Sequence, residues 1–174
     1  KNFLSLFVLM SQMIPITVMM LPFYYIMNNI GLVDSKFGIA LCHLSISLPM
    51  VTWMIKGYVA GVPLSIEEAA TIDGCTQPQL FTRILIPIMK PAIATTSVYA
   101  VICSWNEYAI ANVLSRTTGS KTLPLSLSEF STYFEVNWGQ TMAAAVVISI
   151  PVVAVYMQIQ KQFVSGVTSG AVKQ

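Results

Sequence analysis

Charged residues are scarce in this chain. It has 174 residues, of which nine are lysine or arginine and seven are aspartate or glutamate, so 9% are charged, against about 25% in an average soluble domain. Hydrophobic residues make up 55% of the chain, and its mean hydropathy is +0.71. So few charges cannot cover a folded core with a solvated surface, which favours lipid as the solvent. The net charge of +2 is too small to indicate nucleic-acid binding.

Residues that form disulfides or bind metals are also few. The three cysteines, Cys42, Cys75 and Cys103, are far apart and odd in number, which predicts neither a disulfide framework nor a zinc site. We expect them to be small packing residues. His43 is the only histidine, and no acidic residue is close to it in the sequence, so we expect it to pack between helices. No metal site and no catalytic residues are predicted.

An initiator methionine and a signal peptide are missing too. The chain opens KNFLSLF, without the charged start and small-residue cleavage site of a secretory signal. We therefore expect that its start has been removed or that it is a fragment of a longer protein.

Long apolar stretches are plentiful by contrast. About 20 apolar residues cross the roughly 30 Å of hydrocarbon in a bilayer, and four stretches meet this length: 3–27, 37–56, 91–114 and 141–160. Pro15, Pro22, Pro49 and Pro151 lie within them, and we expect these prolines to kink the helices rather than end them. The predicted fold class is an all-α integral membrane protein, a polytopic helical bundle of about four transmembrane helices in one domain, 1–174.

Lysine and arginine predict the orientation, because cytoplasmic loops carry an excess of both. With the N-terminus in the cytoplasm, the inner segments hold six of these residues and the outer loops hold three, Lys36, Arg116 and Lys121. This orientation places a loop, about 57–90, and a tail, about 161–174, in the cytoplasm.

The predicted cytoplasmic loop reads SIEEAATIDGCTQPQLFTRILIPIMKP over residues 65–91. Ser65 and Glu68 fit a capping box, which predicts a helix over 66–73, and Gly74 suits the left-handed residue after a helix. Thr76 and Gln79 repeat the capping pattern and predict a second helix over 77–86. Two capped helices joined by a glycine would form a rigid bracket between two spans. The pattern fits both a docking element and a plain interfacial loop.

The same loop carries a family motif. Glu68-Ala69-Ala70, three residues, Gly74, nine residues and then Ile84-x-Ile86-Pro87 resembles the E-A-A-x3-G-x9-I-x-L-P signature of permease subunits in bacterial ATP-binding-cassette importers, with isoleucine in place of the leucine. Elsewhere the chain is similar to the maltose-type second permease of the carbohydrate-uptake branch, through WNEY at 105–108, TLPLSL at 122–127, WGQTMAAAV at 138–146 and the tail FVSGVTSGAVKQ. Such permeases ordinarily have six spans, so the resemblance implies a type I importer permease that lacks its first two.

The resemblance implies roles for the loop and the tail. The helix with Glu68 would be a coupling helix that docks in a cleft of the ATPase subunit, where Glu68 would cap its own helix, pair with a basic group of the ATPase, or do both. The tail would reach toward the ATPase dimer in an extended shape, with a disordered terminus as the alternative. The implied docking residues are Glu67, Glu68, Ala69, Ala70, Asp73, Gly74, Ile84 and Pro87, and those of the tail are Gly166, Gly170 and Lys173.

Three residues near the end of the third span are candidates for the solute pathway. Glu107 is the one acidic residue within a predicted span, and ionisable residues inside membranes are functional candidates. An interfacial or purely structural placement is the alternative for Glu107. Trp105 and Asn106 could stack on or hydrogen-bond to a sugar, although tryptophan is also common in membrane-interface belts.

The resemblance also implies the partners and the setting. The chain would be no enzyme and hold no cofactor, because ATP and magnesium would bind a separate ATPase subunit. It would pair with a second permease, an ATPase dimer and an extracytoplasmic solute-binding protein in a bacterial or archaeal plasma membrane. ATPase closure would push the coupling helices together and switch the spans between inward-facing and outward-facing states. The implied cargo is a mono- or oligosaccharide, and glycerol phosphate, a polyol or an amino acid are the alternatives.

Two other function classes find less support in the residues. A membrane-embedded hydrolase needs a nucleophile and a base, or paired carboxylates, at membrane depth, and the spans offer only His43 and Glu107. A proton-coupled carrier usually needs more than one intramembrane acid.

Overall fold

Every regular element among the described residues is a helix, which confirms the all-α prediction. The computed structural model describes residues 6, 8, 10–130 and 137–171, with side chains as far as residue 158. The elements are α2 (Ile16–Asn29), α3 (Lys36–Ala60), α4 (Leu64–Ile72), α5 (Gln77–Gln79), the π-helix η1 (Leu80–Leu85), α6 (Ile86–Ile88), α7 (Lys90–Trp105), α8 (Ala109–Leu114), α9 (Leu123–Leu127), the 3-10 turn η2 (Ser128–Phe130) and α10 (Trp138–Ala171).

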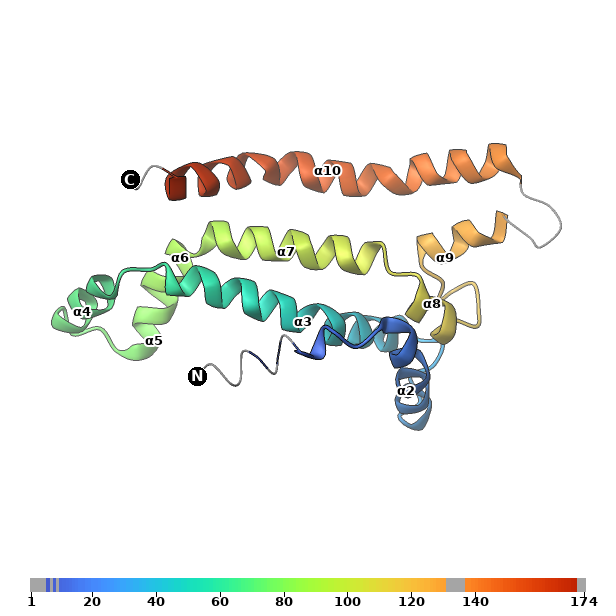
Figure 1. Cartoon of the computed structure of the whole chain (residues 1–174), viewed down its shortest axis with the longest axis horizontal. Helices are drawn as coiled ribbons and strands as arrows, with labels where there is room; N and C mark the ends of the chain where they lie inside the picture. The colour runs from blue at the N-terminus through green and yellow to red at the C-terminus, as the bar shows by residue number, and fades with distance from the viewer. Residues whose placement is uncertain (1–5, 7, 9, 131–136, 172–174) are drawn as a thin grey trace.

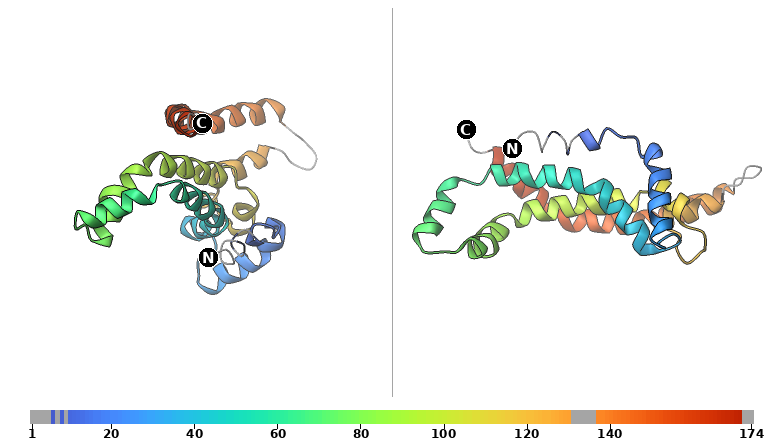
Figure 2. Two further views of the ribbon diagram at one scale, coloured as in Figure 1. Left: turned by 60° about the vertical axis from the view of Figure 1, so that its left-hand side comes forward. Right: turned by 90° about the horizontal axis from the view of Figure 1, so that it is seen from below.

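Three long helices lie side by side along the molecule. α7 lies between α3 and α10 and packs against both (Figure 1). The short helices α4 and α5 project beyond one end of this layer, whereas α2, α8 and α9 gather at the opposite end. α10 runs back toward the end that carries α4 and α5, and α2 lies at a steep angle to α3 (Figure 2).

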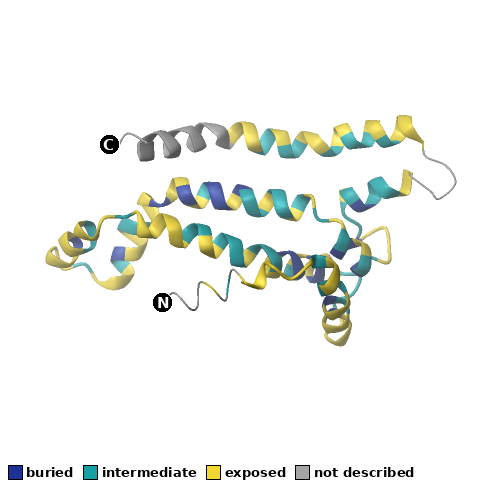
Figure 3. Ribbon diagram, in the orientation of Figure 1, coloured by how far each residue is buried: buried dark blue, intermediate teal, exposed yellow. Residues whose placement is uncertain are grey.

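The largest buried cluster lies at the end of the layer opposite α4. It joins α2, α3 and α8 through Phe23, Met27, Ile39, Cys42, Ile110 and Leu114. Many residues outside this cluster are exposed (Figure 3). Large apolar side chains are exposed along α10, namely Met142, Val146, Val147, Ile150, Val153, Tyr156 and Met157. An apolar surface of this extent requires lipid or protein around it.

Two helices within the described ranges are long and apolar enough to cross a membrane, by length and composition alone. They are Lys36–Ala60 and Trp138–Gln158, and a third candidate joins Gln77–Ile88 to Lys90–Trp105 through a bend of 72°. The first two overlap the predicted spans 37–56 and 141–160. Pro49 and Pro151 lie inside these helices, as predicted.

The other two predicted spans are interrupted. In the stretch 3–27, the described chain leaves the helix over residues 12–15 and α2 begins after Pro15. The expectation that Pro15 only kinks a helix is therefore wrong, because a proline has no N–H to donate and disfavours the helical conformation at the residue before it. Pro22 does lie inside α2. In the stretch 91–114, α7 ends at Trp105 and α8 begins at Ala109.

The turn from α2 to α3 is held by close backbone contacts. Gly31 has a φ of +70°, and the N–H groups of Gly31 and Leu32 donate to Asn28 and Met27 at 3.2 and 2.8 Å, which is the Schellman pattern of a helix C-terminus. A β-carbon on Gly38 would lie 2.2 Å from the backbone oxygen of Leu32. The absence of a side chain at Gly38 therefore lets this turn pack on the first turn of α3.

Candidate functional site

The first element of the predicted coupling loop begins two residues earlier than expected. α4 spans Leu64–Ile72, and Pro63 is the residue that precedes it. The predicted capping box of Ser65 and Glu68 is wrong, because α4 has no side-chain cap at its start. Pro63 is the N-cap and is extended, with a ψ of 135°, and the helix begins at Leu64, so Ser65 already lies inside the first turn. Glu68 is exposed and makes no hydrogen bond or ion pair with the described residues.

The end of α4 follows the prediction from Gly74. Its φ is +76°, a left-handed conformation that glycine adopts without steric cost. The N–H of Cys75 donates to the oxygen of Ala70 at 3.0 Å, and the N–H of Gly74 donates to Thr71 at 3.1 Å. These two bonds form a Schellman motif, the ending that also closes α2.

The second predicted capping box, formed by Thr76 and Gln79, is present. The N–H of Thr76 donates to the side-chain oxygen of Gln79 at 2.9 Å, and α5 begins at Gln77. The predicted helix over 77–86 then differs in kind, because Leu80–Leu85 forms a π-helix and α6 extends to Ile88. A π-helical turn inserts an extra residue into the helix and is frequent at functional sites. Residues 64–88, from α4 to α6, are called the bracket below.

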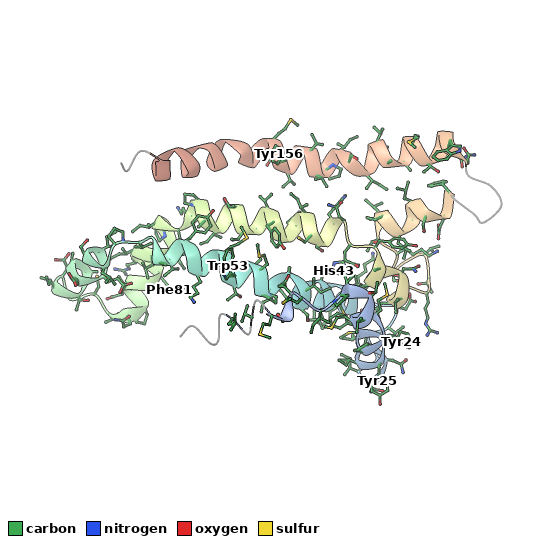
Figure 4. All side chains as sticks on the ribbon, in the orientation of Figure 1. Tyr24, Tyr25, His43, Trp53, Phe81 and Tyr156 are labelled. Carbon is green, nitrogen blue, oxygen red and sulfur yellow. The ribbon has the colours of Figure 1, made fainter. Side chains whose placement is uncertain are left out.

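The bracket exposes apolar side chains on one face of α4. Leu64, Glu68 and Ile72 follow one another at intervals of four residues and therefore share a face. Leu64 is 71% exposed and Ile72 is 85% exposed, whereas Ala70 is 4% exposed. Phe81 is also exposed and lies on the bracket near α5 (Figure 4). Two large aliphatic side chains on either side of a carboxylate are typical of a surface that binds another protein.

The other residues of the predicted docking set lie elsewhere on the bracket. Ala69, Asp73 and Pro87 are exposed, and Glu67 and Ile84 are half-buried. The structure thus brings the predicted set together on one projecting element. Gly166 and Gly170 lie in the last part of α10, which is helical to Ala171, so the expected extended shape of the tail is wrong over those residues. Lys173 lies outside the described residues.

The predicted pathway residues have three different environments. The indole N–H of Trp105 donates to the oxygen of Ile148 on α10 at 3.3 Å. Asn106 is exposed. The side chain of Glu107 is 9% exposed and accepts the backbone N–H groups of Ile110 and Ala111 at 2.9 and 3.2 Å, so it caps α8.

Sequence reasoning missed that His43 and Glu107 lie together. Nε2 of His43 lies 3.1 Å from Oε2 of Glu107, and Nδ1 lies 2.8 Å from Oγ of Ser104. The partners are 61 and 64 positions away from His43, so no local pattern could reveal them. His43 does pack between helices, as expected, because it is buried on α3 and contacts Ser104 of α7, but its polar partners were not predicted. In the described part of the chain no three histidine, cysteine or acidic residues are placed to hold a metal ion.

A cleft of about 550 Å³ lies beside the side chains of His43 and Ser104. Its walls come from α3, α7 and the start of α9, and most of the lining is apolar. His43, Ser47, Ser104 and Trp105 contribute to the lining. Of the three predicted pathway residues, Trp105 alone is among the lining residues.

A second group of polar contacts connects the turn between α2 and α3 to the loop after α8, at the same end of the molecule. Asp34 has a φ of +62°, and its carboxylate accepts the backbone N–H groups of Arg116 and Thr117 at 2.8 and 2.9 Å, together with the hydroxyls of Thr117 and Ser120. These donors, led by Ser120, hold the pKa of Asp34 well below its usual range, because each of them stabilises the charged form.

Comparison with known proteins places the chain among transport permeases. Residues 1–169 match the model of a family described as binding-protein-dependent transport system inner membrane component. The diacetylchitobiose uptake system permease protein DasC of Streptomyces coelicolor is 38% identical over 165 residues, which are 95% of this chain and 60% of that protein. The arabinooligosaccharides transport system permease protein AraQ of Bacillus subtilis is 32% identical over 173 residues, 99% of this chain and 61% of that protein.

A solved structure has the same fold. It is a crystal structure of a bacterial ABC transporter involved in the import of the acidic polysaccharide alginate, with a TM-score of 0.66, 27% sequence identity and coverage of 91% of this chain and 60% of that chain. The present chain thus spans about three fifths of the length of these proteins.

Proposed function

This chain belongs to the family of binding-protein-dependent transport system inner membrane components, and from that premise we propose that it forms part of the permease of an ATP-driven sugar importer. The observation that carries the proposal is the bracket, a projecting element whose exposed Leu64, Glu68 and Ile72 lie on the helix of the E-A-A motif. An element exposed in this way needs a partner, and in this family the motif implies an ATPase subunit.

The proposed contact with the ATPase combines apolar burial with one charge. Leu64 and Ile72 would fill an apolar cleft on the ATPase, and burying each side chain stabilises a contact by about 1.5–3 kcal/mol. Because Glu68 caps no helix and has no partner in the described chain, we assign it to a basic group across the interface. The ATP-bound ATPase dimer would bring two such brackets together, one from this chain and one from a second permease.

The orientation follows from the same assignment. The bracket faces the cytoplasm in this proposal, and α10 runs toward the bracket end of the molecule (Figure 1), so its C-terminal residues would lie on that side as well. The end with α8, α9 and Asp34 would face outward, toward a solute-binding protein. The chain would lie in the plasma membrane of a bacterium or an archaeon.

The proposed cargo is a mono- or oligosaccharide. Proteins similar to this chain are named for the uptake of diacetylchitobiose, arabinooligosaccharides and trehalose, which supports the sugar class. Trp105 remains our candidate for a contact with solute because it lines the cleft. Glu107 is a weaker candidate because its carboxylate already accepts the N–H groups at the start of α8. Glycerol phosphate, a polyol or an amino acid is the alternative cargo.

Co-expression of the full-length permease with its candidate ATPase and second permease tests the proposal. We expect a complex that takes up labelled sugar only with ATP, and we expect Glu68→Lys to weaken its assembly more than Glu68→Gln does. Thr118→Lys introduces the same residue at an exposed position at the opposite end and should leave assembly unchanged. Uptake by the permease without any ATPase would contradict the proposal.

Competition with unlabelled solutes then identifies the cargo. Mono- and oligosaccharides should reduce uptake of the labelled sugar, whereas glycerol phosphate, polyols and amino acids should not. Competition by glycerol phosphate, a polyol or an amino acid alone would favour the alternative.

A further inference from the structure

His43 joins two helices that are distant in the sequence. It lies on α3, and its ring nitrogens contact Ser104 at the end of α7 and Glu107 in the break between α7 and α8. The side chains of His43 and Glu107 are 8% and 9% exposed. An ionised carboxylate only accepts hydrogen bonds, so Nε2 carries the hydrogen toward Glu107, and Nδ1 shares a hydrogen bond with the hydroxyl of Ser104 whose direction follows the tautomer of the ring.

Glu107 divides its oxygens between α8 and His43. Oε1 accepts the N–H of Ile110 at 2.9 Å, and Oε2 accepts the N–H of Ala111 at 3.2 Å as well as Nε2 of His43. The capping bonds fix the direction in which α8 leaves the break, and the histidine fixes the break against α3. α8 contributes Ile110 and Leu114 to the buried cluster that contains Phe23 and Met27 of α2. The position of α8 therefore also determines how α2 packs.

The bracket joins the same two helices at their other end. α3 ends at Ala60, four residues before α4, and α7 begins at Lys90, two residues after α6. The bracket therefore connects α3 and α7 at one end, and the His43 contacts connect the two packed helices again, from within α3, toward the other end (Figure 4). Two helices joined at a single end can splay when that end is pushed, whereas a pair joined at both ends moves as one body.

We propose that His43 is a positioning residue for transport, which through Glu107 makes α3, α7 and α8 move together when the bracket is displaced. This inference rests on the proposed function. The His43–Glu107 contact transmits the movement of the bracket to the outer end, and it touches neither solute nor nucleotide. Without it the bracket still docks and the ATPase still turns over, but α8 follows α3 and α7 less closely, because among the described residues only the apolar cluster and the bonds of Asp34 then connect it to α3.

The test compares three variants of His43 in the full-length, assembled importer. In glutamine the amide nitrogen lies near the position of Nε2, so His43→Gln retains the contact with Glu107. In asparagine the amide lies near the position of Nδ1, so His43→Asn retains only the contact with Ser104. His43→Ala removes both. The measured quantity is the ratio of labelled sugar transported to ATP hydrolysed in proteoliposomes.

We expect this ratio to fall about fivefold or more in His43→Ala and His43→Asn, the lower end of typical coupling between two sites, and to stay near the wild-type value in His43→Gln. Loss of stability alone reduces the number of working complexes and lowers transport and hydrolysis together, so it leaves the ratio unchanged. If the His43→Ala complex fails to assemble, the ratios of His43→Gln and His43→Asn test the inference instead.

Ser45→Ala is the matched control, because Ser45 lies on the same helix and bonds only to the backbone of Leu41. An unchanged ratio in both His43→Ala and His43→Asn overturns the inference, as does an equal fall in the Gln and Asn variants. A wild-type complex without ATP-driven uptake overturns the proposed function itself, and this result is distinct from an altered ratio in the variants.

Discussion

The carboxylate of Asp34 accepts the backbone N–H of Arg116 at 2.8 Å, although 82 positions separate the two residues. Asp34 follows α2 and Arg116 follows α8, so the contact closes a loop of chain that contains α3, the bracket and α7. The N–H of Asp34 also donates to the oxygen of Leu114 at 2.9 Å. Backbone and side chain together therefore fix the end of the molecule opposite the bracket.

Replacing Asp34 with asparagine should destabilise the protein in a pH-dependent way. The folded-state pKa of Asp34 lies below its usual value, so the carboxylate stabilises the fold fully above the unfolded-state pKa of about 3.9 and loses this contribution as the pH falls. The difference in unfolding temperature between wild type and Asp34→Asn should stay constant from about pH 8 to 5 and shrink below about pH 4. Thermal unfolding in detergent measures it, and a difference that grows in acid would contradict the assignment.

Replacing Gly74 with a residue that has a side chain should impair the bracket through backbone strain, without any steric clash. No atom lies within 4 Å of a β-carbon at this position, but a left-handed conformation costs a residue with a side chain about 1–2 kcal/mol. Gly74→Val should therefore distort the end of α4 and reduce assembly with the ATPase in a pull-down. Gly57→Val is the control, because the space around Gly57 is also open and its φ is not positive. Equal losses from both variants would show that the turn is not the cause.

The two capping signals in the bracket should respond differently to mutation. Gln79→Ala removes the acceptor of the Thr76 N–H and should cost about 1 kcal/mol, the usual loss for a helix cap. Ser65→Ala should change stability by less than about 0.5 kcal/mol, because Ser65 is exposed and α4 has no side-chain cap. The rate of proteolysis of the bracket measures this difference. Faster cleavage of Ser65→Ala than of Gln79→Ala would contradict the assignment of a cap to Gln79 and none to Ser65.

Gly38→Ala should be among the more harmful single-methyl additions in this chain. Its β-carbon would lie 2.2 Å from the backbone oxygen of Leu32, so the turn after α2 must move. Overpacking of this kind costs typically about 1–3 kcal/mol, and the unfolding temperature should fall accordingly. Gly57→Ala adds the same methyl group in open space and should leave the unfolding temperature almost unchanged. A stable Gly38→Ala variant would mean that the turn moves at little cost.

Some local signals in the sequence predicted local structure correctly, although the capping box of Ser65 and Glu68 did not. A left-handed glycine and a Thr-x-x-Gln cap each depend on a few neighbouring residues, so Gly74 and Thr76 could be interpreted directly from the sequence. Pro15 shows the limit, since a proline in an apolar stretch lies inside a helix at one place and precedes it at another, as Pro22 and Pro15 do. Contacts between distant positions, such as His43 with Glu107 or Asp34 with Arg116, depend on packing that no short pattern encodes.

The length of α10 determines how the protein meets membranes of different thickness. Its 34 residues extend for about 51 Å at 1.5 Å per residue, which exceeds the hydrocarbon of any ordinary bilayer. Residues 138–160 carry no charge and extend for roughly 34 Å, close to the thickness of a thick plasma membrane. The depth of insertion is thus set by Trp138 and Lys161 at the two ends of this stretch rather than by where the helix stops. In a thinner membrane α10 should tilt, and because it packs against α7, the lipid composition should influence the geometry of the whole layer.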